Sequence, residues 1–160
     1  MSNYLFLLAM VFSLIPTAAK GGEADPMIEL RVRCINGDPC RFTGEPIRVE
    51  LELFNAGGEN VPVPVEYFRK QGPKVILIDN HSSKEKRLGM GPPMPYLFNQ
   101  LEMLEPGQSI RIPWSVPEYH IARFALRPVS VTAIFRFNLA PGTTLAERKF
   151  VYAQLPIEGG

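Results

Sequence analysis

The sequence has few of the side chains from which most metal and redox sites are built. It contains two cysteines and two histidines among 160 residues, which leaves little for a metal centre of the usual soft ligands. No Cys-x-x-Cys pair and no Gly-x-Ser-x-Gly motif occurs in the chain, so the local signatures of thiol redox enzymes and α/β-hydrolases are missing. These shortages favour a protein that binds over one that catalyses, and we expect no cofactor.

An excess of charge of either sign is also missing. The chain has 17 Lys+Arg and 16 Asp+Glu, a formal net charge of +1, so no broad field would collect nucleic acid or an acidic membrane. Hydrophobic residues make up 46% and charged residues 21% of the sequence, which is typical of a globular protein. The length allows one domain. We therefore expect a single domain that binds no nucleic acid.

Long hydrophobic runs are limited to the N-terminus. Tyr4–Ile15 carries no charge, but it is shorter than the roughly 20 residues that a membrane-spanning helix needs. Pro16 ends the run, and Thr17-Ala18-Ala19 supplies the small residues of a cleavage site. This pattern predicts a secretory signal peptide at residues 1–19, although no Lys or Arg precedes the run. A buried N-terminal element is the alternative.

The predicted boundaries of the mature protein follow from this reading. Residues 20–27 are polar and glycine-containing and read as a flexible leader, residues 28–156 as the folded domain, and residues 157–160 as a short tail. We expect the protein to be secreted or periplasmic, with no membrane insertion after the signal is removed.

Apolar residues recur at every second position over most of the domain, as in half-buried β-strands. No segment carries a sustained helical pattern, and Glu118–Phe124 is long enough only for a short helix. Pro62 and Pro64 cannot donate to a sheet, so the strand that contains them is placed at an edge. Trp114 is in phase with the apolar positions of its strand and is predicted to lie inside. The predicted strands are Ile28–Cys34, Ile47–Leu53, Val61–Tyr67, Val75–Ile78, Ile110–Val116, Val129–Phe137 and Phe150–Leu155.

Turns rich in glycine and proline separate these strands. About seven or eight short strands at such spacing predict an all-β fold, an antiparallel immunoglobulin-like β-sandwich. A single core between two sheets suits this length.

Some of the turn sequences resemble those of a known group of domains. Phe42-Thr43-Gly44-Glu45-Pro46-Ile47 followed by Leu53-Phe54-Asn55-Ala56-Gly57 is similar to the opening of many bacterial exported immunoglobulin-like domains, and Leu104–Gln108 to their entry into a later strand. The chain most resembles the group that includes BsuPI-type proteinase inhibitors and related adhesive or accessory modules. The similarity covers residues 42–137. It implies an immunoglobulin-like fold and a non-enzymatic role, and it carries over no functional residue.

The two cysteines, Cys34 and Cys40, flank a turn that contains Asn36-Gly37. In an oxidising compartment we expect them to form a disulfide across a hairpin, worth roughly 2 kcal/mol in the chain-entropy model. Two free buried thiols are the alternative. Because the cysteines are so close in sequence, we expect their bond not to join the two sheets.

A polar loop holds Asp79, His81, Ser82 and Ser83, which are residue types of hydrolase triads. A triad needs these side chains to converge in space, and crowded into one loop they would mostly diverge. The neighbouring cations of residues 84–87 are mixed with Glu85 and lack interleaved aromatic residues. Both segments therefore read as a solvated loop.

The most unusual stretch is the predicted partner-binding loop, which consists of Gly89, Met90, Gly91, Pro92, Pro93, Met94, Pro95 and Tyr96. Its three prolines stiffen the backbone, while the methionines and the tyrosine offer adaptable apolar contacts. The competing interpretation is that Met90 and Met94 cover the open end of the core.

Three functions remain open from the sequence. The leading one is an exported, non-enzymatic module that contacts another protein through residues 89–96. The second is a proteinase inhibitor that presents this loop to an active-site cleft. The third is a periplasmic copper-binding protein in which Met90 and Met94, with Met103 or His81, would supply soft ligands.

Overall fold

The computed structural model describes residues 28–35, 37–141 and 149–159, so the predicted signal peptide and leader lie outside the described residues. The described chain is mostly β-strand, which confirms the all-β prediction. Within it no helix is long and apolar enough to cross a bilayer. The strands are β1 (Ile28–Cys34), β2 (Cys40–Phe42), β3 (Ile47–Asn55), β4 (Val61–Val63), β5 (Lys74–Asp79), β6 (Glu85–Arg87), β7 (Glu102–Leu104), β8 (Ser109–Val116), β9 (Val129–Asn138) and β10 (Phe150–Gly159).

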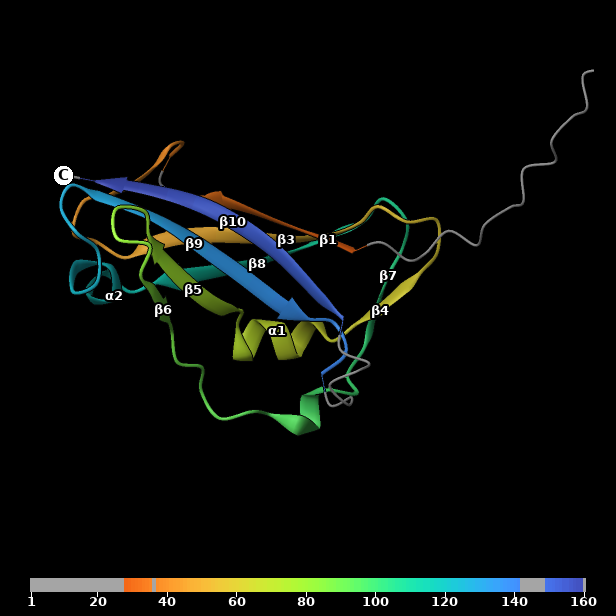
Figure 1. The fold of residues 1–160 in the computed structure, drawn as a ribbon. Helices are drawn as coiled ribbons and strands as arrows, with labels where there is room; N and C mark the ends of the chain where they lie inside the picture. The colour runs from red at the N-terminus through yellow and green to blue at the C-terminus, as the bar shows by residue number, and fades with distance from the viewer. Residues whose placement is uncertain (1–27, 36, 142–148, 160) are drawn as a thin grey trace, which may run out of the picture.

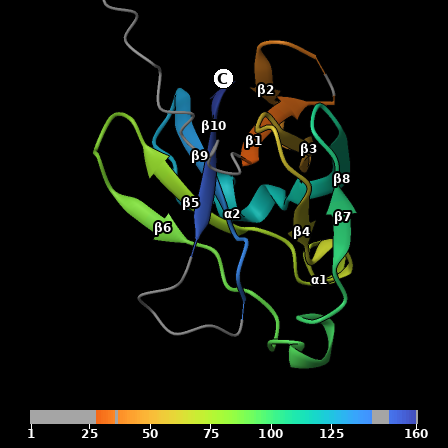
Figure 2. The same cartoon turned by 90° about the vertical axis from the view of Figure 1, so that its right-hand side faces the viewer.

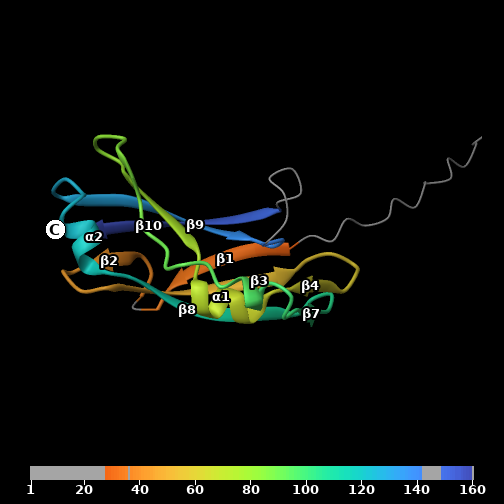
Figure 3. The same cartoon turned by 90° about the horizontal axis from the view of Figure 1, so that it is seen from below.

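These strands form three sheets, two of which lie one over the other as two layers (Figures 1 and 3). One layer has the order β1-β3-β8 and the other the order β2-β10-β9-β5-β6, while β4 and β7 form a separate pair. Figure 2 shows this pair set to one side of the two layers, near the helix α1 (Val65–Gln71).

The core fills the space between the layers. Burial alternates residue by residue along β3 and β9, because successive side chains of a strand point to opposite faces and only one face of each sheet meets the other layer. Leu51 of β3 and Phe135 of β9 are both 0% exposed. The alternation that predicted these strands therefore also identifies their inner faces.

The predicted strand Val61–Tyr67 is wrong beyond Val63. Residues 65–71 form α1, whose buried residues Val65 and Phe68 lie three positions apart on one helical face. Glu66 pairs with Arg69 at 3.8 Å and with Lys70 at 3.5 Å, the spacings that bring side chains together on a helix surface. The spacing of Val61, Val63, Val65 and Tyr67 also fits a strand, so the local pattern was ambiguous.

Other differences concern short or terminal strands. The described chain holds ten strands rather than about seven or eight, because β2, β6 and β7 are three-residue strands, too short to show alternation. The predicted tail is also wrong, since β10 continues through Ile157 to Gly159 and pairs there with β9. The same residues pair with β2 in parallel, so the sheet is not purely antiparallel. Ile157, which is buried, holds this end of the chain in the core.

A disulfide joins Cys34 to Cys40, with the two Cα atoms 5.5 Å apart, as predicted. Its setting differs from the prediction, because β1 and β2 do not form a hairpin. Cys34 ends a strand of the three-stranded sheet and Cys40 begins a strand of the five-stranded sheet. The bond therefore links the two layers, which the short sequence separation had appeared to exclude.

Trp114 packs against the core but is only half-buried. Its ring lies over Gly72, which connects α1 to β5 with a φ of 73°. A Cβ atom at Gly72 would overlap the indole ring, so both the backbone conformation and the close approach require glycine here.

Candidate binding site

One hydrogen bond ties the predicted binding loop to a distant part of the fold, and two others lie at its ends. At its start, the amide of Leu88 donates to the carbonyl of Val75 at 2.9 Å, and at its end the amide of Leu97 donates to the carbonyl of Met94 at 3.0 Å. Between them, the buried side chain of Gln71 donates from Nε2 to the carbonyl of Gly91 at 2.8 Å. The loop then enters a 3-10 turn, η1 (Pro95–Leu97).

The loop divides its apolar side chains between the protein and the solvent. Met90 and Met94 are half-buried, whereas Pro92 and Pro93 are exposed and Tyr96 is 68% exposed. Met90 forms part of a cavity wall. One part of the predicted partner-binding loop therefore contacts the fold, while the other part faces outward. Neither Met90 nor Met94 is among the described hydrophobic residues that pack against the core.

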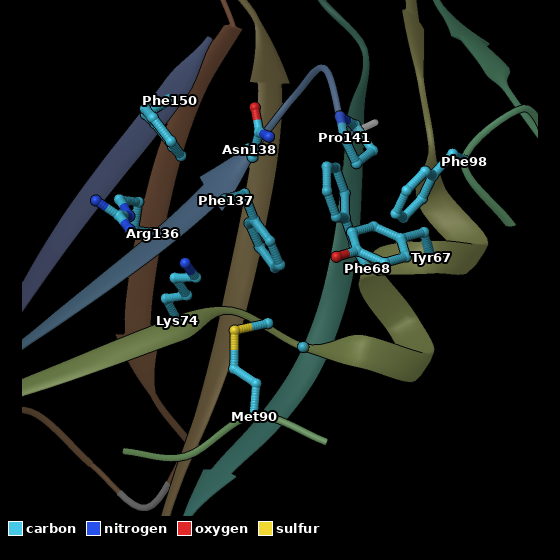
Figure 4. Close-up of a pocket in the computed structure, with 11 residues that line it drawn as sticks. Tyr67, Phe68, Lys74, Met90, Phe98, Arg136, Phe137, Asn138, Pro141 and Phe150 are labelled. Carbon is cyan, nitrogen blue, oxygen red and sulfur yellow. The ribbon is translucent and has the colours of Figure 1, made fainter. Parts of the chain in front are cut away.

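The cavity behind Met90 has a volume of about 370 Å³ and lies where β9 ends and β5 begins, beside α1. Figure 4 shows an aromatic group at one side of it and the cations Lys74 and Arg136 at the other, with Phe137 between them. The lining residues are Tyr67, Phe68, Gly72, Lys74, Met90, Phe98, Arg136, Phe137, Asn138, Pro141 and Phe150.

A second cavity of about 340 Å³ adjoins the first, because both are lined by Lys74, Met90 and Arg136. It runs over the outer side of β5 and β6 and adds Arg87 to the lining. Among the described residues, neither cavity has a carboxylate in its wall. The two together form what we call the cationic groove: a mixed polar and apolar surface with the three positive side chains Lys74, Arg87 and Arg136.

Lys74 and Arg136 lie directly opposite each other in the β5–β9 register. Like charges in this position repel each other and destabilise a sheet. The Arg136 guanidinium lies 4.5 Å from the centre of the Phe150 ring, and its Nε atom is buried without a hydrogen-bond partner in the described part of the chain. No described carboxylate forms an ion pair with Lys74, Arg87 or Arg136.

The aromatic end of the groove is held by ring contacts. Phe68 and Phe137 have ring centroids 4.4 Å apart, and Tyr67 meets Phe98 edge to face at 4.9 Å. Burial raises the pKa of the Tyr67 hydroxyl, so this group stays neutral at physiological pH. The groove thus has an uncharged end and a cationic end.

The polar loop at Asp79 is not arranged as a catalytic triad. In a triad the serine hydroxyl bonds the imidazole, whereas here the Ser82 hydroxyl donates directly to the Asp79 carboxylate. The imidazole Nε2 of His81 lies instead 2.8 Å from the carbonyl oxygen of Pro128. The hydrogen bond from the Ser82 hydroxyl is the main reason that the pKa of Asp79 is lowered. Through this bond the buried Asp79 carboxylate stabilises the turn between β5 and β6.

Two of the candidate copper ligands, His81 and Met90, lie apart. His81 lies in the turn that closes the β5–β6 hairpin, whereas Met90 follows its open end, beyond the bond from Leu88 to Val75. Met103 is 56% exposed on β7, and it lines neither cavity of the cationic groove.

No protein-family model matches the chain, and a search of curated proteins finds no match. The resemblance to exported immunoglobulin-like domains therefore stays a prediction that rests on the turn residues.

Sequence reasoning identified Met90 but missed the cationic groove. Lys74 in β5 and Arg136 in β9 have three strands between them in the sequence, and each is unremarkable beside its own neighbours. The outward positions of β9 are mostly polar, so Arg136 at one of them gave no signal of a site. Its opposite partner became visible only with the strand register.

Proposed function

We propose that this protein is an exported immunoglobulin-like β-sandwich that acts as a non-enzymatic binding module and contacts a protein partner through residues 89–96. The two stacked sheets and their shared core support the sandwich. The Cys34–Cys40 disulfide supports an oxidising compartment, secreted or periplasmic, because such bonds are rare in the cytosol.

The observation that carries the proposal is the tethering of a proline-rich loop whose outer side chains remain exposed. The Gln71 side chain holds the loop at Gly91, and Leu88, just before the loop, pairs with Val75. Prolines 92, 93 and 95 have already lost much backbone freedom. A partner that immobilises such a loop loses less conformational entropy than one that orders a flexible loop.

Exposed apolar side chains are concentrated next to the loop. Tyr96, Leu101 and Met103 are 68%, 52% and 56% exposed, and they lie within one short segment. Tyrosine and methionine are enriched at protein interfaces. The outer side of the loop and this segment therefore provide a surface suited to a protein.

The test compares Tyr96→Ala with a matched control, Tyr119→Ala, whose tyrosine is 46% exposed on α2 (Glu118–Ala122). The mature protein is immobilised and the exported fraction of its host is passed over it. If Tyr96 is a central contact, its loss should reduce the specifically retained protein about tenfold, equivalent to ~1.4 kcal/mol. The Tyr119 variant should retain it as the wild type does. Equal retention by both variants would contradict the assignment of the loop.

A proteinase inhibitor is the second candidate, and the same tethering supports it, since a stiff exposed loop can occupy a cleft with little loss of entropy. A panel of serine, cysteine and metalloproteinases distinguishes the two. Inhibition that Tyr96→Ala or a proline replacement at 92 or 93 abolishes would identify the partner as a proteinase.

A further inference from the structure

We propose that the cationic groove binds a small amphiphile with one carboxylate head group and an apolar body. This site is separate from the outer side of the loop and does not depend on the proposed protein partner. Met90 is the shared boundary, because it belongs to the loop and lines both cavities.

The first argument is the charge balance of the groove. Lys74 and Arg136 are directly opposite each other, and Arg87 lines the same space. Within the described chain the walls contain no carboxylate that could neutralise them. A bound anion would replace the repulsion between these side chains with attraction.

The second argument is the state of Arg136. One face of its guanidinium lies against Phe150, and its buried Nε atom has no hydrogen-bond partner in the described structure. A buried donor without a partner is unfavourable. A carboxylate matches the planar donor edge of arginine and can accept two parallel bonds from it. Lys74 can add a third charge-assisted bond from the neighbouring strand.

The third argument is the apolar end. The half-buried rings of Tyr67 and Phe98 line the part of the cavity away from the cations, packed on the buried rings of Phe68 and Phe137, and Met90 lines the cavity nearer Lys74 (Figure 4). Methionine adapts its shape to varied apolar ligands. The two adjoining volumes of about 370 and 340 Å³ each lie within the usual range for small-molecule sites, roughly 300–1,000 Å³. A straight alkyl or aryl chain therefore fits with its head group at Arg136.

The experiment uses calorimetric titration of the mature protein with decanoate, its neutral analogue decanol and the cation decyltrimethylammonium, all below their micelle concentrations. Decanoate should bind at least tenfold more tightly than decanol, and the cation should not bind. Decanoate affinity should fall as salt rises, because the head-group contribution is screened. Equal affinities for decanoate and decanol would overturn the proposal.

Variants locate the binding. Arg136→Gln should weaken decanoate binding about tenfold or more, and Lys74→Gln should weaken it by a smaller factor. Arg111→Gln, which removes a cation from the outer face of the other layer, is the matched control and should change affinity less than twofold. Equal losses in Arg136→Gln and Arg111→Gln would overturn the site, provided that thermal melts show both variants folded.

Two further measurements separate this inference from the proposed function. Tyr96→Ala should leave decanoate affinity unchanged within twofold, whereas it should reduce retention of the protein partner. Trp114 fluorescence supplies a second signal, because Trp114 packs on Gly72 of the cavity wall. A decanoate-dependent change should disappear in Arg136→Gln, and its persistence there would place the ligand elsewhere.

Discussion

The outer faces of the two large sheets both carry positive side chains, but they differ in whether carboxylates of the protein pair with them. On the three-stranded sheet, Arg33 lies 2.8 Å from Glu50, and Arg111 lies 3.6 Å from both Glu50 and Glu52. On the five-stranded sheet, Lys74 and Arg136 face each other without a described carboxylate nearby. On the first face Arg33 and Arg111 are paired with carboxylates of the protein, whereas on the second Lys74 and Arg136 retain their positive charge beside apolar surface, which is why we assign the ligand site to it.

The inner faces of the two sheets, by contrast, should respond alike to truncation of a core side chain. The loss of stability from such a truncation is the largest effect that we expect. Leu51 and Phe135 are both 0% exposed and lie in different layers of one core. Truncation leaves a cavity, so Phe135→Ala should cost ~3–5 kcal/mol and Leu51→Ala ~2–5 kcal/mol. Urea unfolding measures both. A variant with an unchanged midpoint would show that its layer does not share the core.

The disulfide should give an intermediate effect. It links the two layers through β1 and β2, and its loss in Cys34→Ala with Cys40→Ala should lower the free energy of unfolding by ~2 kcal/mol. Urea unfolding of oxidised, reduced and double-variant protein measures this. Reduction of the wild type should reproduce the variant, and reduction should not affect the variant itself. A double variant as stable as the oxidised protein would contradict a stabilising link.

The smallest expected change in stability comes from substitutions on the outer faces. Glu50→Gln removes the partner of Arg33 and Arg111, so it should destabilise the protein by up to ~1 kcal/mol, less at high salt. Lys74→Gln removes a repulsion and should instead stabilise by ~0.2–0.5 kcal/mol. Thermal melts at low and high salt measure the difference. Destabilisation by both variants would mean that the two faces do not differ as described.

Much of the fold was predictable because local pattern and tertiary environment agree. In β3, β8 and β9 every second residue is apolar and the same residues face the other layer. Residues 65–71 were misassigned because their spacing fits a strand as well as a helix, and Phe68 reaches the core only from a helix. The short strands β2, β6 and β7 were not predicted because their three residues show no pattern and only the pairing with other strands defines them.

The candidate site was also predictable only in part. The proline-rich loop was predictable from composition, since proline restricts the backbone wherever it occurs. The contact of Met90 with the cavity and the hydrogen bond from Gln71 to Gly91 could not be predicted, because they depend on which segments of the chain approach the loop.

Alternation along the chain was sufficient to assign the all-β class and the inner faces of β3, β8 and β9. The pairing of the two cysteines followed from their closeness across a turn. All of these depend on neighbours within a few residues. The link between layers through Cys34 and Cys40, the helix α1 and the opposition of Lys74 to Arg136 depend on tertiary structure. Each of them requires segments distant in sequence to meet in a particular register. A shift of one residue in that register would turn Lys74 or Arg136 to the other face of the sheet and remove the cationic groove.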